Sequence, residues 1–121
     1  MYAKLVAGLV AGVVIVAATL AIAGAGSARP DAQATTVVRV KAKDFLFVLS
    51  RKTVPHGKVK FVITNPSPAN HDFAIAGHKS KLVKPHKSTT LTVTLKAGRH
   101  LYKCTVDSHA KLGMKGVLRV R

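Results

Sequence analysis

A cysteine, a histidine and a methionine follow one another at equal spacing near the end of this 121-residue chain. Cys104 is the only cysteine, His109 comes five positions later, and Met114 five positions after that. Thiolate, imidazole and thioether are soft or borderline metal ligands, and a trigonal set of two histidines and one cysteine with a weak axial methionine is typical of electron-transfer copper sites. This run therefore predicts a copper site that needs a second histidine from elsewhere in the chain.

His71 is the leading candidate for that second histidine. It lies 33 positions before Cys104, so only the fold can bring the two together, and it has the same strand parity as Phe73 and Ile75. His100 lies four residues before Cys104 on the same predicted strand, which is too far along that strand to share an ion. The other histidines lie in turn-like basic stretches and are expected to be solvated: His56, His78 and His86.

Each of these residues also has a purely structural interpretation. Cys104 could be a small buried hydrophobic residue, and Met114 could fill a gap in the core. His71 could be a core histidine bonded to the backbone, and His109 a solvated loop residue. The order and spacing of the set favour the ligand interpretation over these alternatives.

The stretches that must position these side chains alternate between apolar and polar residues. A period of two over short segments bounded by Gly, Pro and Asn predicts half-buried β-strands. The predicted strands cover residues 36–43, 45–49, 59–63, 91–95, 98–106 and 117–120, and residues 77–87 are expected to be irregular. Gly113 and Gly116 supply backbone freedom for the chain to turn back after Cys104. We therefore expect an all-β sandwich formed by one domain, residues 35–121.

The first 34 residues have a different composition. Lys4 precedes an uncharged apolar run, residues 5–23, and small residues follow it, as in a secretory signal peptide. The candidate cleavage positions are Ala25, Ala28 and Ala34. The run is also close to the length that spans a bilayer, so an uncleaved membrane anchor stays open. Either way, we expect residues 1–34 to place the domain outside the cytoplasmic membrane, in the periplasm or beyond.

The chain is strongly basic, with a formal net charge of +16, twenty Lys and Arg residues, four Asp and no Glu. Such a surface attracts anionic partners and steers them electrostatically. The few aromatic residues mostly have core parity, so a base-stacking platform for nucleic acid is not expected. We expect a monomer with an acidic redox protein as its partner, no nucleic acid, and membrane contact only through an uncleaved anchor.

The pattern Y-x-C-x4-H-x4-M, with N-H-D-F upstream, resembles the cupredoxin family, the plastocyanin- and azurin-like type 1 (blue) copper proteins. The resemblance covers residues 37–120 and implies a Greek-key β-sandwich that binds one copper ion through His71, Cys104, His109 and Met114. It also implies that electrons pass through a partly exposed His109. Several members have Asn directly after the first histidine, where it braces the cysteine loop. Here Asn70 precedes His71 and Asp72 follows it, which leaves the bracing role open.

Electron transfer by an exported type 1 copper protein is therefore the expected function. The alternative is an extracytoplasmic copper carrier or buffer that delivers copper to an oxidase. A third interpretation is a metal-free sandwich that binds anionic polymers or lipids through its lysines. An enzyme is not expected, because related copper oxidases and nitrite reductases carry a histidine beside the cysteine, whereas Lys103 and Thr105 flank Cys104 here.

Overall fold

The computed structural model describes residues 8, 12–13 and 34–121, and every regular element in this part of the chain is a β-strand. The strands are β1 (Thr36–Lys43), β2 (Leu46–Leu49), β3 (Thr53–Val54), β4 (Gly57–Thr64), β5 (Ala74–Ile75), β6 (His78–Lys79), β7 (Ser88–Leu95), β8 (Gly98–Lys103) and β9 (Lys115–Val120). The all-β prediction is confirmed. The predicted signal peptide or anchor lies almost wholly outside the described residues. Within the described part, no helix is long and apolar enough to cross a membrane.

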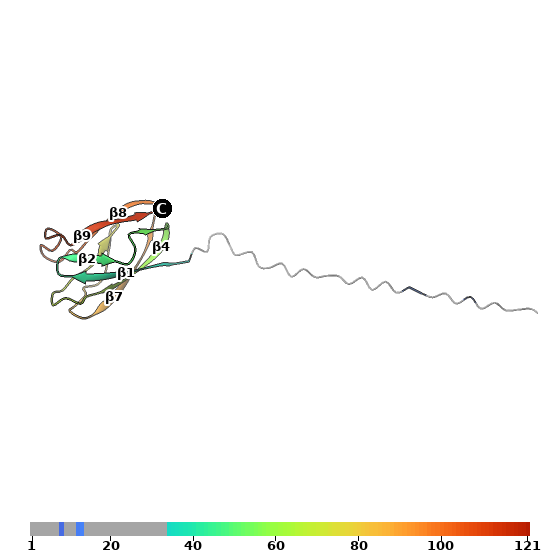
Figure 1. Ribbon diagram of the computed structural model, residues 1–121, viewed down its shortest axis with the longest axis horizontal. Coiled ribbons are helices and arrows are strands. Elements are labelled where there is room, and N and C mark those ends of the chain that lie inside the picture. The colour runs from blue at the N-terminus through green and yellow to red at the C-terminus, as the bar shows by residue number, and fades with distance from the viewer. Residues whose placement is uncertain (1–7, 9–11, 14–33) are drawn as a thin grey trace, which may run out of the picture.

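The strands form two mixed sheets that make the two layers of a sandwich (Figure 1). One sheet has the order β2-β1-β4-β7 and the other the order β3-β9-β8-β5-β6. β1 pairs with β4 in parallel, as β3 does with β9, and the other pairings are antiparallel. β1 ends and β9 begins at the end of the sandwich away from the C-terminus (Figure 1). The loops at this end carry the residues that the sequence singled out.

The core forms where the alternating apolar side chains of the two sheets meet. In β1, Val38, Val40 and Ala42 are fully buried while the residues between them are exposed, as a period of two requires. Phe73 is also fully buried, and three aromatic rings surround it. The rings of Phe61, Phe47 and Tyr102 have their centroids 4.9, 5.3 and 5.4 Å from that of Phe73. This cluster fixes the segment that begins with His71 against the core.

Three local predictions were wrong. Phe45 does not continue the alternation of β2, because it has a φ of 57° in the two-residue turn that joins β1 to β2. β8 ends at Lys103, earlier than residue 106, where the chain leaves the sheet to form the turns before β9. The stretch 77–87 is not wholly irregular, since it contains β6 and since Val83 pairs with His71.

Candidate metal centre

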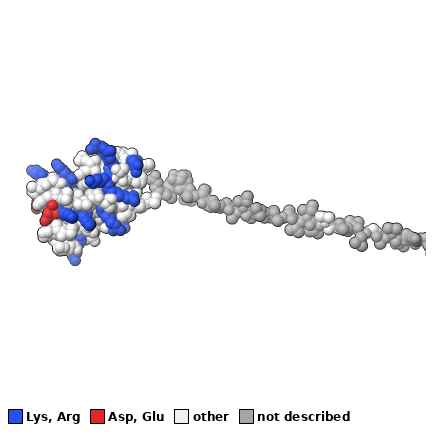
Figure 2. Space-filling view, viewed as in Figure 1, with Lys and Arg blue, Asp and Glu red and all other residues white. Residues whose placement is uncertain are grey.

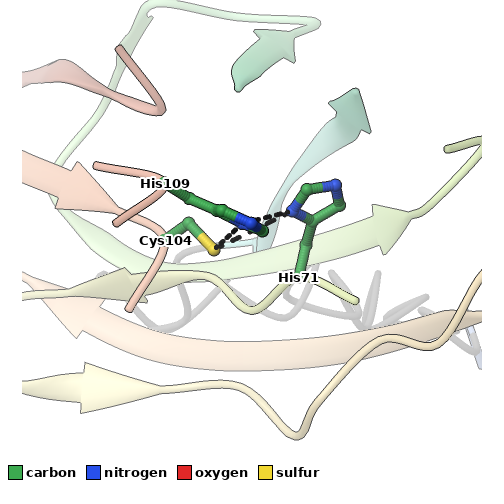
Figure 3. Close-up of side chains that lie close together, drawn as sticks. All are labelled: His71, Cys104 and His109. Atoms are coloured by element: carbon green, nitrogen blue, oxygen red, sulfur yellow. Dashed lines mark hydrogen bonds between the residues drawn. The ribbon is translucent and has the colours of Figure 1, made fainter. Parts of the chain in front are cut away.

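Three ligand atoms converge at the loop end of the sandwich (Figure 3). The Nδ1 atoms of His71 and His109 are 3.2 Å apart, and the Cys104 Sγ lies 3.7 Å from His109 Nδ1 and 3.9 Å from His71 Nδ1. The point equidistant from the three atoms lies about 2.1 Å from each, which is close to the bond lengths that divalent first-row metals make to imidazole and thiolate. The structure therefore brings together three of the four predicted ligands at coordinating distance.

His71 is oriented by side chains of the loop that follows β4. Its Nε2 lies 2.8 Å from Ser67 Oγ, and that hydroxyl lies 2.7 Å from the carbonyl oxygen of the Asn65 side chain. The Ser67 hydroxyl donates to Asn65, so its oxygen accepts the Nε2–H of His71. This hydrogen bond keeps the proton on Nε2 and leaves the Nδ1 lone pair directed at the other two ligand atoms. His71 is fully buried, and the carboxylate of Asp44 lies 3.8 Å from its Nε2, beyond hydrogen-bonding distance.

Asn65 holds the same loop in shape. Its side-chain amide donates to the carbonyl oxygens of Ala69 and Val83 at 2.7 and 2.8 Å, and its side-chain oxygen also accepts the backbone N–H of Ser67 at 3.0 Å. Asn65 is only 1% exposed, so these bonds have little competition from water. The sequence alone gives Asn65 and Ser67 no role, because it does not show which distant groups they contact.

The loop from Cys104 to Met114 is held mainly by its own backbone. The N–H of Cys104 donates to the Met114 carbonyl at 3.0 Å, and the N–H of Met114 donates to the His109 carbonyl at 3.1 Å. Gly113 has a φ of 109°, so its predicted conformational freedom is used. Gly116 has a different role: it lies in β9 against the ring of Tyr102, where a Cβ atom would overlap the phenol.

Met114 is fully buried beside this centre and is tied by its backbone to both Cys104 and His109. The other histidines are elsewhere. His56 and His100 bond to backbone carbonyls of Arg121 and Lys96, and the remaining two, His78 and His86, are exposed. Among the described residues, one group of at least three His, Cys, Asp or Glu side chains has metal-binding geometry, and it is the His71, Cys104 and His109 group.

Asp72 joins the two loops. Its carboxylate accepts the backbone N–H of Thr105 at 2.6 Å and also the Thr105 hydroxyl. Asp72 is 5% exposed, whereas Asn70 is on the surface. The residue after the first histidine therefore braces the residue after the cysteine, and the role that the sequence left open belongs to Asp72.

The electrostatic environment favours the uncharged forms of Cys104 and His71 in the absence of metal. Burial raises the pKa of the Cys104 thiol, and backbone N–H groups of Asp72 and Val106 oppose that rise only in part. Burial, followed by the proximity of His109, lowers the pKa of His71, and the nearby carboxylates of Asp44 and Asp72 offset part of this effect. Neutral imidazole is the form that binds metal, while the thiol must lose its proton.

The donor set distinguishes among metals. Two imidazoles and one thiolate in a trigonal arrangement, with a methionine adjacent, suit copper, whereas structural zinc takes four tetrahedral nitrogen or sulfur ligands. The hydrophobic core that surrounds Cys104 and Met114 would also control solvent access to an ion held there. The residues present fit a single copper ion.

Comparison with known proteins agrees with this fold. A family model for a cupredoxin-like domain matches residues 12–120. Dithionite-reduced auracyanin from Roseiflexus castenholzii is 23% identical, with a TM-score of 0.63 over 74% of this chain and 99% of the auracyanin chain. Auracyanin B is 19% identical, with a TM-score of 0.62 over 73% of this chain and 89% of its own. Auracyanin A, described as a "blue" copper protein from Chloroflexus aurantiacus, is also 19% identical, with a TM-score of 0.61 over 73% of this chain and 100% of its own. These structures share the fold. No curated protein sequence matches the chain.

Proposed function

Because this chain belongs to the cupredoxin-like domain family, we propose that it is a type 1 copper protein that carries single electrons between redox partners. His71, Cys104, His109 and Met114 are the residues that would hold the ion. Copper, when bound, supplies the one-electron Cu(II)/Cu(I) couple. The observation that carries the proposal is the triangle of two Nδ1 atoms and one Sγ with edges of 3.2, 3.7 and 3.9 Å.

The protein residues keep this triangle nearly fixed. Ser67 and Asn65 hold His71, Asp72 ties the two loops together, and backbone hydrogen bonds close the loop between Cys104 and Met114. Ligands held in this way would move little when the site gains or loses one electron. A small rearrangement lowers the barrier to electron transfer, since little energy goes into moving groups before the electron can transfer.

His109 is the ligand through which electrons enter and leave. It is half-buried, whereas His71, Cys104 and Met114 are at most 1% exposed. Phe45 packs edge-on against the His109 ring with a centroid distance of 5.2 Å, and Phe45 is 42% exposed. Leu112, which lies on the same loop as His109, is 57% exposed. An apolar rim around a half-buried ligand suits brief contact with a partner, because little polar surface must lose its water.

The copper-carrier alternative has less support from the site. A carrier must release its ion, and three of the four ligands are inaccessible to an incoming acceptor. An oxidase or nitrite reductase mechanism has no support at Cys104 either, since its flanking residues, Lys103 and Thr105, are not histidines. We further propose that the domain works outside the cytoplasmic membrane, because of the apolar run at residues 5–23, and that its redox partner is acidic.

Absorption and electron paramagnetic resonance spectra of the chain with one equivalent of Cu(II) test the proposal. We expect an intense blue thiolate-to-copper band with narrow copper hyperfine splitting, both absent in Cys104→Ala. The matched control is His100→Ala, which removes a histidine of β8 outside the group and should keep both features. A pale spectrum with ordinary hyperfine splitting would contradict the type 1 site and favour the carrier or the metal-free alternative.

A further inference from the structure

Three lysines form a row across the outer face of the sheet whose strand β8 ends just before Cys104. Lys79 on β6 pairs with Ala74 on β5, Ala74 pairs with Lys103 on β8, and Lys103 pairs with Lys115 on β9. Directly paired residues of antiparallel strands project on the same side of the sheet, so the three side chains share one face. All three lysines are exposed. We call these residues the lysine row.

The lysine row is unfavourable for the isolated domain. Like charges directly opposite each other on neighbouring strands destabilise a sheet, and Lys103 faces Lys115 in this way. Among the described residues, no Lys or Arg side chain lies within 4.0 Å of a carboxylate, and the one contact of that kind is between His71 and Asp44, so no carboxylate neutralises the row. Basic side chains also spread over the face shown in Figure 2, with acidic atoms confined to a small area. The row lies within a surface whose potential favours an anionic partner.

An apolar groove lies beside the lysine row. It has a volume of about 460 Å³, and all three lysines line it together with Ala74, Leu101 and Thr105. Leu101 is 73% exposed, which is unusual for a large apolar side chain in the middle of a strand. Apolar surface edged by one sign of charge suits a partner that combines an apolar side chain with opposite charges around it.

We propose that the lysine row and its groove dock the acidic face of a redox protein, with carboxylates on the three lysines and an apolar side chain on Leu101. The inference rests on the proposed electron-transfer function and adds a second surface, separate from the apolar rim at His109. The position is suited to that use. Lys103 and Thr105 line the groove, and Cys104 lies between them in the chain, so a partner seated there contacts both covalent neighbours of the thiolate ligand.

Nuclear magnetic resonance titration of the copper-loaded, Cu(I) full chain tests this docking surface. The probe is a synthetic acidic hexapeptide with a central leucine, sequence DEDLED, and the same peptide with serine in place of leucine tests the apolar contribution. We expect salt-sensitive amide shifts centred on β5, β6, β8 and Lys115, with weaker binding of the serine peptide. Shifts centred on Phe45, His109 and Leu112 would overturn the proposal, as would shifts spread evenly over the basic surface or no binding.

Lys115→Glu provides the sharpest variant, since it places a carboxylate opposite Lys103. We expect peptide affinity to fall about tenfold at low salt, while the denaturation midpoint is maintained or rises because a like-charge pair becomes an ion pair. Lys60→Glu is the matched control: it makes the same charge change at an exposed position of β4 in the other sheet, and affinity should change about twofold or less. Equal losses in the two variants would overturn the proposal.

The blue absorption band of the same samples, measured after oxidation to Cu(II), separates this proposal from the function on which it rests. A normal band with peptide shifts elsewhere would reject the docking surface alone. An absent band would reject the type 1 site, and peptide shifts at the lysine row would then support an anion-docking surface with no redox role, which also overturns the proposal as stated.

Discussion

The two loops that supply the ligands are stabilised in different ways. The loop before His71 depends on side chains, since Asn65 and Ser67 bond to groups up to 18 residues away. The loop from Cys104 to Met114 depends on backbone bonds between residues within ten positions of each other. The first loop is therefore specified by long-range partners and the second largely by its own local spacing.

This difference predicts where substitutions will be most costly. Removing a side chain from the His71 loop leaves buried polar groups without partners, whereas most side chains of the Cys104 loop can change while its backbone bonds persist. Asp72 is the exception, because it is a side chain that joins the two loops.

The largest expected effect is that of Asn65→Ala. The substitution leaves the N–H and the hydroxyl of the buried Ser67 without the oxygen that accepts them. It also removes the amide donor of the Ala69 carbonyl and one of the two donors of the Val83 carbonyl, which keeps the N–H of His71. An unsatisfied buried polar group costs about 1–3 kcal/mol, so we expect the free energy of unfolding to fall by roughly 3 kcal/mol. Urea denaturation of the copper-free protein measures this loss.

Asn70→Ala is the matched control for that measurement. It makes the same chemical change directly before His71, but Asn70 is exposed, so the free energy of unfolding should change by about 0.5 kcal/mol or less. Similar losses in the two variants would show that the His71 loop does not depend on the Asn65 bonds.

The same contrast explains what could be predicted from sequence. The alternation in residues 36–43 predicted β1 with its observed bounds, and the spacing of Cys104, His109 and Met114 predicted their proximity, because both patterns are local. Asn65 and Ser67 could not be assigned, since their partners are set by how β4 and the loop before β5 pack. The turn at Phe45 was also missed, because an aromatic residue with positive φ is rare and is tolerated here where its ring packs on His109.

Ser67→Ala should reduce copper affinity without unfolding the domain. The Nε2–H of His71 would lose its acceptor, and the imidazole could then rotate or place its proton on Nδ1. Loss of such an outer partner typically costs about 10–100-fold in metal affinity. Competition with a chelator for Cu(II) measures the change.

Ser108→Ala is the corresponding control on the other loop, at an exposed position next to His109. Its copper affinity should stay within about twofold of the parent, because backbone bonds hold that loop. If Ser67→Ala binds copper as tightly as Ser108→Ala, the proposed orientation of His71 by the hydroxyl is wrong.

The two loops should also differ in the protons that they release on copper binding. Burial raises the pKa of the Cys104 thiol, so it is protonated at neutral pH and must lose one proton to bind. Burial lowers the pKa of His71, which is therefore already neutral and releases none. Copper affinity should rise about tenfold per pH unit between pH 7 and 8 from the thiol alone.

Calorimetry in buffers of different ionisation enthalpy counts these protons directly. We expect about one proton per copper ion at pH 7.5 from the thiol, and Cys104→Ala should lose this release. Affinity that does not depend on pH over this range would mean that Cys104 is already a thiolate before copper binds.

The smallest expected effect concerns the residue that joins the two loops. Asp72→Asn keeps an oxygen for the Thr105 N–H, and the Thr105 hydroxyl can turn to accept from the new amide, so the brace persists while its negative charge is lost. A nearby negative charge stabilises Cu(II) more than Cu(I). We therefore expect the reduction potential to rise by roughly 40–60 mV, which for one electron corresponds to a free energy on the order of 1 kcal/mol.

Spectroelectrochemical titration of Asp72→Asn beside Asp107→Asn separates this charge effect from a general one. Asp107 is exposed on the Cys104 loop, and asparagine tolerates its φ of 44°, so the two variants make the same change at a buried and a solvated carboxylate. Salt should screen the Asp107 effect strongly and the Asp72 effect weakly. If Asp72→Asn lowers the potential, or loses the blue band, the carboxylate acts on the site through geometry more than through its charge.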